Sequence, residues 1–188
     1  MKICFAASSG GHFEQLMMLK PLMEKYESFV VTEKTGYEVK TPVKCYYLQQ
    51  VNRRQWRCLF YLLKNTVDSL RLLHKEQPDV VVCTGVLAMI PLCMEAKLSG
   101  RKLIYIESFA KVTSATLTGK LLYHYADRFY VQWTQMKEIY PDALRRLAKE
   151  TPKAAKQLKS SGFPLEVDGL PALLIKSYIT NINQYPII

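Results

Sequence analysis

The chain contains 188 residues, of which 49% are hydrophobic and 22% charged, a balance that supports one hydrophobic core and excludes wholesale disorder. Its formal net charge of +10 favours an anionic partner, such as nucleic acid, an anionic lipid surface or a phosphorylated substrate, without choosing among them. Five scattered cysteines with no C-x-x-C pair indicate buried thiols rather than a metal site.

The start of the sequence does not have the pattern of a secretion signal. Met1–Ala7 is too short for one and leads directly into a glycine-rich turn. No segment approaches the roughly 20 apolar residues needed to span a bilayer. We therefore expect that the chain does not cross a membrane by itself, although it can still lie on a membrane surface.

Residues 1–143 alternate short apolar runs with stretches in which apolar residues recur at spacings of three and four. In chain order, this pattern predicts a strand over Lys2–Ala7, a helix over His12–Tyr26 that Pro21 can kink, strands over Phe29–Thr32 and Val43–Leu48, a helix over Trp56–His74, a strand over Asp79–Cys83, a helix over Val86–Leu98, a strand over Leu103–Ile106, a helix over Leu117–Ala126 and a strand over Phe129–Gln132.

Helices that alternate with short, continuously apolar strands predict the α/β class, with a parallel sheet covered on both faces. Right-handed crossovers then give a Rossmann-like layered structure. The character of the sequence changes after Tyr140-Pro141-Asp142, where a basic helical pattern and a turn-rich stretch precede an apolar tail. We therefore divide the chain into a Rossmann-like domain over 1–143 and a C-terminal extension over 144–188.

Three predicted strand ends carry residues suited to ligand binding, and ligands of open α/β sheets gather at these ends. Ser8–His12 follows the first strand, where glycines let the backbone approach a phosphate and His12 could take a proton from a hydroxyl. Thr84-Gly85 repeats this design, and Glu107 ends a strand where it could bind a sugar hydroxyl or orient a base. The alternatives are ordinary turns with an exposed His12, and a Glu107 that caps a helix or pairs with a lysine, Lys111 or Lys120.

The long predicted helix begins with Arg53-Arg54-Gln55-Trp56-Arg57. Guanidinium groups suit phosphate recognition, and tryptophan suits a membrane interface. Leu62, Leu72 and Leu73 widen the apolar face beyond what one core contact needs. We therefore expect Trp56, Arg57 and Phe60 to contact a membrane surface, with a core helix that has a solvated basic face as the alternative.

Other known catalytic and ligand-binding motifs are missing from the sequence. It contains no G-x-S-x-G element, no Ser/His/Asp set and no metal-ligand spacing, and we expect neither metal nor cofactor. Nucleic-acid binding is not expected either, because no RNP-like or helix-turn-helix signature accompanies the basic charge. Asp127, Trp133 and His124 have no partner in the sequence and are interpreted as structural.

Five stretches together resemble one known family. They are SSGGH near the start, VVTEKT at Val30–Thr35, YIESFAKV at Tyr105–Val112, LTGKLLYHYADRFYVQW at Leu117–Trp133 and YPDA at Tyr140–Ala143. The pattern is similar to the bacterial PssD/CpsF-type subunits of exopolysaccharide and capsule synthesis. Their eukaryotic counterpart is the ALG-fourteen subunit, which acts in building the dolichol-linked chitobiose of N-glycans. The resemblance covers nearly all of residues 1–143, in the same order.

The resemblance implies the N-terminal half of a GT-B glycosyltransferase, whose UDP-sugar-binding half is a separate polypeptide. It implies that the chain acts with this partner subunit on a lipid-diphosphate acceptor, at the cytoplasmic face of the cell membrane as a peripheral protein. Ser9, Gly10, Gly11 and His12 fall on the first glycine-rich loop of the family, Thr84 and Gly85 on the second, and Glu107 on its motif glutamate.

Our hypothesis is that His12, helped by Glu107, assists deprotonation of the acceptor hydroxyl during transfer of a sugar from a UDP-sugar. The two loops together with Arg53 and Arg54 would hold the diphosphate. In the alternative hypothesis, the chain is a non-catalytic membrane anchor or activator of its partner. The N-terminal anchor of the eukaryotic form is not found here, so attachment would rest on Arg53–Lys75. Residues 144–188 lie outside the resemblance, as a lineage-specific extension, a partner-docking tail or a segment foreign to the natural protein.

Overall fold

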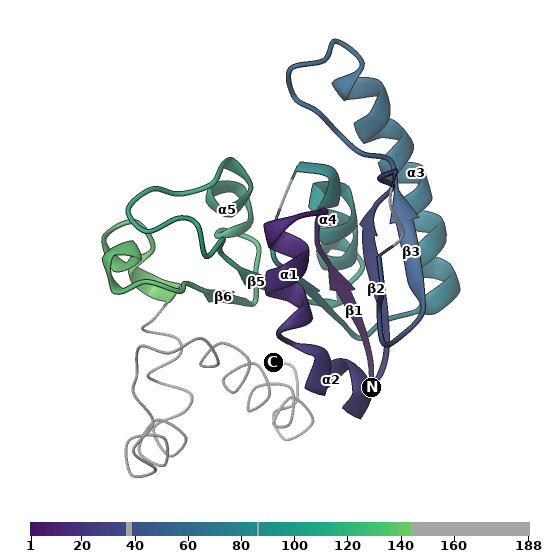
Figure 1. Cartoon of the computed structure of the whole chain (residues 1–188), viewed down its shortest axis with the longest axis horizontal. Coiled ribbons are helices and arrows are strands. Elements are labelled where there is room, and N and C mark those ends of the chain that lie inside the picture. The colour runs from purple at the N-terminus through teal and green to yellow at the C-terminus, as the bar shows by residue number, and fades with distance from the viewer. Residues whose placement is uncertain (37–38, 86, 144–188) are drawn as a thin grey trace.

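The computed structural model describes residues 1–36, 39–85 and 87–143 of the chain. Within these residues, six parallel strands form one sheet in the order β3-β2-β1-β4-β5-β6 (Figure 1). The strands are β1 (Lys2–Ala6), β2 (Glu27–Glu33), β3 (Cys45–Leu48), β4 (Val80–Cys83), β5 (Lys102–Ile106) and β6 (Arg128–Tyr130). The predicted α/β class and Rossmann-like sheet are therefore confirmed. The extension predicted at 144–188 lies outside the described residues.

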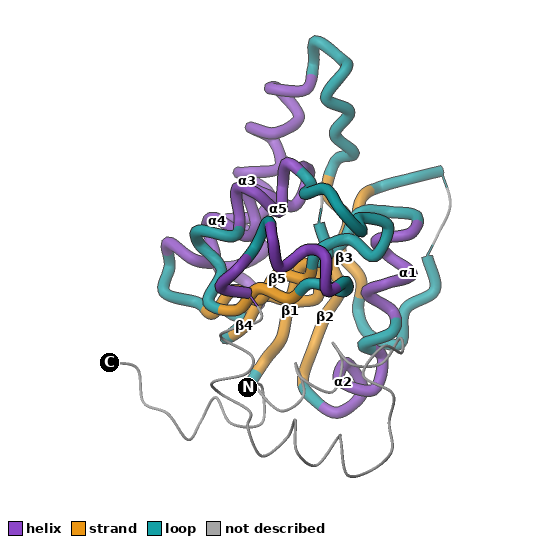
Figure 2. The backbone as a smooth tube through the Cα atoms, turned by 90° about the vertical axis from the view of Figure 1, so that its left-hand side faces the viewer, coloured by secondary structure: helices purple, strands orange, loops and turns teal. Residues whose placement is uncertain are grey.

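Helices cover both faces of this sheet. They are α1 (Gly11–Met17), α2 (Lys20–Lys25), α3 (Cys58–Glu76), α4 (Ile90–Leu98) and α5 (Leu117–Leu122), with 3-10 turns η1 (Leu87–Met89) and η2 (Thr134–Glu138). The chain runs outward in opposite directions from β1 and from β4, so right-handed crossovers place the following helices on opposite faces. Figure 2 shows α1 and α2 on one side of the strands and α3 and α4 on the other.

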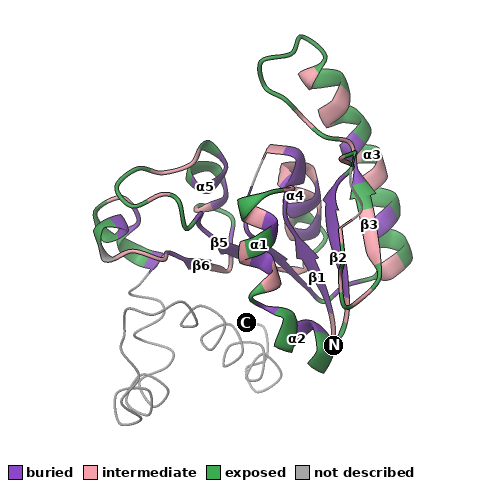
Figure 3. Cartoon of the chain, in the orientation of Figure 1, coloured by how far each residue is buried: buried purple, intermediate pink, exposed green. Residues whose placement is uncertain are grey.

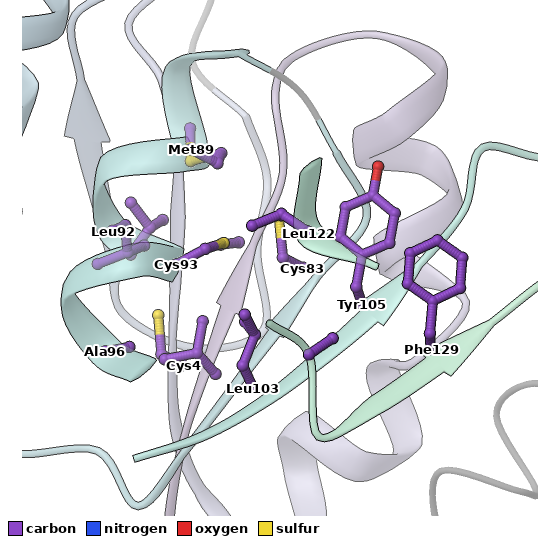
Figure 4. Packing of buried hydrophobic residues seen from close by; sticks show 14 of the residues in the cluster. Cys4, Cys83, Met89, Leu92, Cys93, Ala96, Leu103, Tyr105, Leu122 and Phe129 are labelled. Atoms are coloured by element: carbon purple, nitrogen blue, oxygen red, sulfur yellow. The ribbon is translucent and has the colours of Figure 1, made fainter. Parts of the chain in front are cut away.

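The strands contribute side chains alternately to two hydrophobic cores, because successive residues of a strand point to opposite faces. Ile3 and Phe5 pack in the core under α1 and α2, whereas Cys4 and Cys83 pack in the core under α3, α4 and α5. Apart from the edge strand β3, the strands are accordingly buried along most of their length (Figure 3). Cys93 of α4 joins Cys4 and Cys83 in the second core (Figure 4). Burial raises the pKa of the Cys4 thiol, which stays protonated in the apolar interior.

Three predicted helices differ from the structure in length or continuity. The helix predicted over His12–Tyr26 is two helices, α1 and α2, because Pro21 has no N–H to donate and its ring crowds the carbonyl four residues earlier. Pro91 likewise lies at the start of α4, and the chain before it forms the 3-10 turn η1. The last predicted helix ends at Leu122 rather than Ala126.

The long helix α3 orients its faces differently from the sequence interpretation. Leu72 and Leu73 are buried in the core and do not widen an exposed apolar face, so that part of the prediction is wrong. Asn65 also points inward, where its side chain accepts a hydrogen bond from Gln49 N and donates one to Gln49 O. Large apolar side chains instead lie in solvent: Trp56 just before the helix, and Leu59, Phe60, Leu63, Val67 and Leu70 on it.

An ion-pair network stabilises the sheet at the amino-terminal ends of its strands. The carboxylate of Glu76, at the end of α3, lies 2.6 Å from Lys2 Nζ and 3.3 Å from Lys44 Nζ. Tyr46 donates a further hydrogen bond to it. These hydrogen bonds, that of Lys2 first, lower the pKa of Glu76 to about 2. The network ties β1, β3 and α3 together at the edge opposite the carboxyl ends of the strands.

Glu76→Gln should lower the free energy of unfolding by about 1–2 kcal/mol at pH 7, because both ion pairs are lost. The folded pKa lies below the ordinary value of 4.5, so the stabilisation is complete above about pH 4.5 and disappears as the pH falls toward 2. Urea denaturation of both proteins at pH 7 and pH 3 measures this effect. The difference between them should shrink at pH 3.

Glu27→Gln is the matched control for this prediction. Glu27 also pairs with Lys2, at 3.1 Å, but its side chain is 71% exposed. Its replacement should therefore change the unfolding free energy by less than about 0.5 kcal/mol. A loss of stability in Glu76→Gln that is equal at both pH values would contradict the role given to its ionised carboxylate.

Candidate functional site

The strand order creates a topological switch point between β1 and β4. The chain leaves β1 toward β2 and leaves β4 toward β5, so the two following loops diverge. Ligands of open parallel sheets bind outside the carboxyl ends of the strands at such a point. Ala6 and Cys83 are paired neighbours at these ends, and the predicted turns Ser8–Gly11 and Thr84-Gly85 follow them directly. The structure therefore brings the two predicted turns together.

Two reciprocal hydrogen bonds join the turns through His12. The Nδ1 atom of His12 lies 2.6 Å from the carbonyl oxygen of Thr84, and the Thr84 hydroxyl donates to the carbonyl of His12 over 2.9 Å. A carbonyl oxygen can only accept, so Nδ1 carries the proton. In the neutral imidazole, Nε2 then has a free lone pair. The contact with Thr84 therefore selects the tautomer that a general base requires.

Two structural features require glycine at position 85. Its φ is +104°, in the region that residues with a Cβ rarely adopt. A Cβ at this position would also lie 3.1 Å from Cε1 and 3.2 Å from Nδ1 of the His12 ring, and 3.4 Å from the Tyr105 hydroxyl. The absent side chain thus lets the β4 turn approach the imidazole closely.

Neither of the two turns leads directly into a long α-helix. Gly10, with φ +78°, precedes α1, which is only seven residues long. After Gly85 the chain forms η1 before α4 begins at Ile90, so no α-helix starts directly at the second turn. An anion at this place would therefore meet the backbone of the turns and the His12 ring more than the dipole of a long helix.

Glu33 also lies at the site where the β1 and β4 turns meet, next to Ser9. The sequence interpretation gave it no role. It ends β2, next to β1, and is 6% exposed. Its carboxylate accepts long hydrogen bonds from the Ser9 hydroxyl, at 3.5 Å, and from Val51 N, at 3.4 Å. Burial raises the pKa of Glu33, while these bonds and the charge of His12 oppose the rise. The sequence signal that could have identified Glu33 was its position at the end of a predicted strand, inside the stretch VVTEKT.

Glu107 lies at the end of β5, as predicted, but its carboxylate is enclosed. It is 1% exposed and accepts hydrogen bonds from Ser108 N at 2.8 Å, the Thr116 hydroxyl at 2.9 Å and the Tyr140 hydroxyl at 2.8 Å. Thr116 in turn caps α5 by accepting from Gly119 N. A Cβ at Gly119 would collide with the Glu107 carboxylate, so the glycine admits this group.

This arrangement is closest to the helix-capping alternative considered for Glu107. The carboxylate braces the connection from β5 to α5 and holds Tyr140 against it. Among the described residues, it forms no ion pair with Lys111 or Lys120. A direct catalytic role for Glu107 stays a prediction.

The basic segment before α3 lies in solvent. Arg53 and Arg54 are exposed, and neither guanidinium pairs with another residue in the described part of the chain. Trp56 is 86% exposed, and the Arg57 guanidinium lies 5.0 Å from its ring centroid. In Figure 1 the first turns of α3 and the loop before them project away from the sheet. Their contacts with phosphate or membrane stay predictions.

The described residues contain neither a candidate metal cluster nor a membrane-spanning helix. Within residues 1–36, 39–85 and 87–143, no group of three or more His, Cys, Asp and Glu side chains is placed to hold a metal ion. None of the helices described there is both long enough and apolar enough to cross a membrane. Asp127, interpreted as structural, accepts a hydrogen bond from Leu103 N and pairs with Lys97 at 2.8 Å.

Gly85→Ala should displace the His12 ring and cost about 1–3 kcal/mol of stability, through backbone strain and the contact with the ring. Gly100→Ala is the matched control, because Gly100 also has a positive φ, +77°, but a Cβ there meets nothing within 4 Å. Both variants should melt at lower temperature, and the NMR signals of the His12 ring should move only in Gly85→Ala. Unmoved signals would show that the two turns are not closely coupled.

The sequence of the chain matches a known family along most of its described length. The family model "Oligosaccharide biosynthesis protein Alg14 like" matches residues 3–146. The chain is 32% identical, over 168 residues, to the UDP-N-acetylglucosamine transferase subunit ALG14 of Yarrowia lipolytica, covering 76% of this chain and 78% of that protein. It is 30% identical over 172 residues to the subunit of the same name from Rattus norvegicus, covering 76% and 80%.

The fold has a match among solved structures. MurG from Acinetobacter baumannii superimposes with a TM-score of 0.60 at 18% sequence identity, which shows a shared fold. The match covers 72% of this chain and 43% of that chain, so the shared fold corresponds to less than half of MurG. The expected likeness to one half of a GT-B glycosyltransferase is confirmed at the level of the fold. On the family match and these two relatives, the chain belongs to the Alg14-like family of oligosaccharide biosynthesis proteins.

Proposed function

We propose that the chain is the acceptor-side subunit of a two-component glycosyltransferase, which transfers a sugar from a UDP-sugar to a lipid-diphosphate-linked acceptor. Its relatives are named as subunits of UDP-N-acetylglucosamine transferase. The word subunit in these names supports a partner subunit, to which we assign the UDP-sugar site. The observation that carries the proposal is the meeting of the β1 and β4 turns at His12.

In this proposal, the chain's residues divide between binding and proton transfer. Backbone groups of Ser9, Gly10 and Gly11, together with Thr84-Gly85, face the acceptor diphosphate. Arg53 and Arg54 add positive charge that no neighbouring acid neutralises among the described residues.

The reaction itself forms one bond and breaks one. The acceptor hydroxyl oxygen bonds to the anomeric carbon of the donor sugar, the bond from that carbon to the UDP oxygen breaks, and UDP leaves with the electron pair. His12 Nε2 takes the hydroxyl proton, because the Thr84 carbonyl holds the ring with its proton on Nδ1. Glu107 helps by holding the chain after β5 in place.

We also propose that the chain works as a peripheral protein at the cytoplasmic face of the cell membrane. The exposed apolar side chains of α3, bordered by Arg53, Arg54 and Arg57, support membrane contact. The five stretches that resemble PssD/CpsF-type subunits support exopolysaccharide or capsule synthesis as the setting. The donor in that setting is a UDP-sugar, and the acceptor is a lipid-diphosphate-linked sugar.

His12→Ala should reduce sugar transfer by about 100- to 10,000-fold while leaving the fold intact, because the lone pair that accepts the proton is lost. The measurement is transfer to lipid-diphosphate acceptor by the chain co-expressed with its partner. Glu107→Gln serves as a contrast, since it should lower both the melting temperature and the rate. Unchanged turnover in His12→Ala would remove His12 from the chemistry.

The alternative is a non-catalytic anchor or activator, and the enclosed carboxylate of Glu107 favours it by leaving fewer free groups for chemistry. A partner subunit carrying an artificial membrane tether separates the two hypotheses. Full activity of the tethered partner without this chain would favour the anchor. Activity that depends on this chain, and on His12, would favour the shared active site.

Trp56→Ser combined with Phe60→Ser should weaken binding to vesicles that contain anionic lipid by at least about tenfold, because two large apolar side chains lose their burial. Binding should also weaken at high salt, since the nearby arginines are screened. Vesicle co-sedimentation measures both effects. Leu98→Ser is the control, because Leu98 is 82% exposed but lies on α4. Equal binding by all three proteins would contradict the membrane surface assigned to α3.

A further inference from the structure

Phe109 follows Ser108 in the connection from β5 to α5, which we call the β5 loop. Its side chain is exposed, but both of its backbone polar groups are hydrogen-bonded to side chains. The N–H group of Phe109 donates to Gln15 Oε1 over 3.1 Å, and its carbonyl accepts from the Trp133 indole N–H over 2.7 Å. Gln15 also donates to the Glu107 carbonyl over 2.9 Å. Side chains from α1 and from the segment after β6 therefore satisfy both backbone groups of Phe109.

The ring of Phe109 packs against Trp133 but remains open to solvent. The two ring centroids lie 4.9 Å apart with an angle of 49° between the planes, and Phe109 is 46% exposed. The bonds to its backbone and the contact with the indole restrict its orientation. The protein thus presents a fixed aromatic surface outward instead of burying it.

The other end of this loop is equally constrained. Thr116, where α5 begins, is bonded to the enclosed carboxylate of Glu107, and Tyr140 is bonded to the same group. The segment between Ser108 and Thr116 is therefore anchored at both ends. Its exposed members include Thr113 and Ser114, which carry hydroxyl groups, beside the half-buried Lys111.

This aromatic pair lies beside the place where the β1 and β4 turns meet. Gln15, which binds Phe109, is three residues after His12 on α1. Residues with this spacing are neighbours on a helix surface, with Cβ atoms about 5–6 Å apart. A ligand held at His12 can therefore extend toward the β5 loop.

We propose that Phe109, supported by Trp133, is the platform on which the sugar ring of the lipid-diphosphate acceptor stacks. One face of a pyranose ring is a patch of C–H groups, and its edge carries hydroxyls. An aromatic face with polar groups beside it matches that chemistry. The platform orients the acceptor hydroxyl toward His12, and so this inference rests on the proposed function.

The fixed geometry favours a sugar over a bilayer as the occupant. Contact with acyl chains needs exposed apolar area but no defined ring orientation, and α3 offers such area separately. Stacking on a sugar needs one defined face, which the bonds from Gln15 and Trp133 provide. The structure thus assigns two separate aromatic surfaces to two parts of one ligand, its sugar and its lipid.

The test uses the full 188-residue chain with Trp56→Phe, which leaves Trp133 as its single tryptophan because the sequence contains two. The probes are phytanyl diphosphate and the same lipid bearing N-acetylglucosamine, each titrated in a mild detergent. We expect the sugar-bearing lipid to bind more tightly and to change the Trp133 emission, whereas the sugar-free lipid leaves the emission nearly unchanged.

We expect the starting protein to bind the sugar-bearing lipid about 3- to 10-fold more tightly than the sugar-free lipid. Phe109→Ala should abolish this difference in affinity, and Phe109→Tyr should retain it because the ring remains. Leu117→Ala is the matched control, since Leu117 is 69% exposed at the start of α5 but is not part of the aromatic pair. Melting temperatures show whether each variant is folded. Binding of the sugar-free lipid should be the same in all of them.

The outcomes separate the two proposals. A preference for the sugar-bearing lipid that survives in Phe109→Ala would overturn the platform and leave the proposed function standing. Failure of the starting protein to bind either lipid would contradict the proposed function and the platform with it. If Phe109→Ala weakened association with the partner subunit yet kept the sugar preference, the ring would belong to a protein interface and the inference would be wrong.

Discussion

The paired hydrogen bonds between His12 and Thr84 are the constraint on which the candidate site depends. They join two turns that are about seventy residues apart in the chain but follow neighbouring strands. One bond sets the tautomer of the imidazole, and the other fixes the backbone of α1 against β4. Gly85 makes both possible, because any side chain there would meet the ring. The geometry of the candidate site therefore rests on the close approach of two backbones.

Carboxylates have different roles at the two ends of the strands. At the amino-terminal edge, Glu76 joins Lys2 and Lys44 in an ion-pair network that stabilises the fold. At the carboxyl-terminal edge, buried carboxylates are used to hold loops: Glu33 binds the β1 loop, and Glu107 binds the connection into α5. Such groups are costly to bury, and they are retained where a loop needs a defined position.

The exposed apolar side of α3 shows why periodicity alone does not identify a core face. Phe60 and Leu63 recur at helical spacing as core residues do, yet they lie in solvent. The inward side of the helix instead carries Asn65, which bonds the backbone at the end of β3. A sequence pattern reports that a helix has an apolar side, but the sheet decides which side it covers.

The sequence by itself determined the succession of strands and helices along the chain, the parallel α/β sheet and the turns at the strand ends. These features follow from local hydrophobic patterns and from the positions of glycine. Its motifs also pointed to the Alg14-like family, whereas the bacterial PssD/CpsF-type assignment stays a prediction. Only the tertiary structure decided that His12 meets Thr84, that Glu33 joins the candidate site, that Glu107 is enclosed, and that Trp133, packed against the core, also supports Phe109. These contacts join residues distant in the chain, and their geometry depends on strand order and side-chain packing, which a local pattern does not contain.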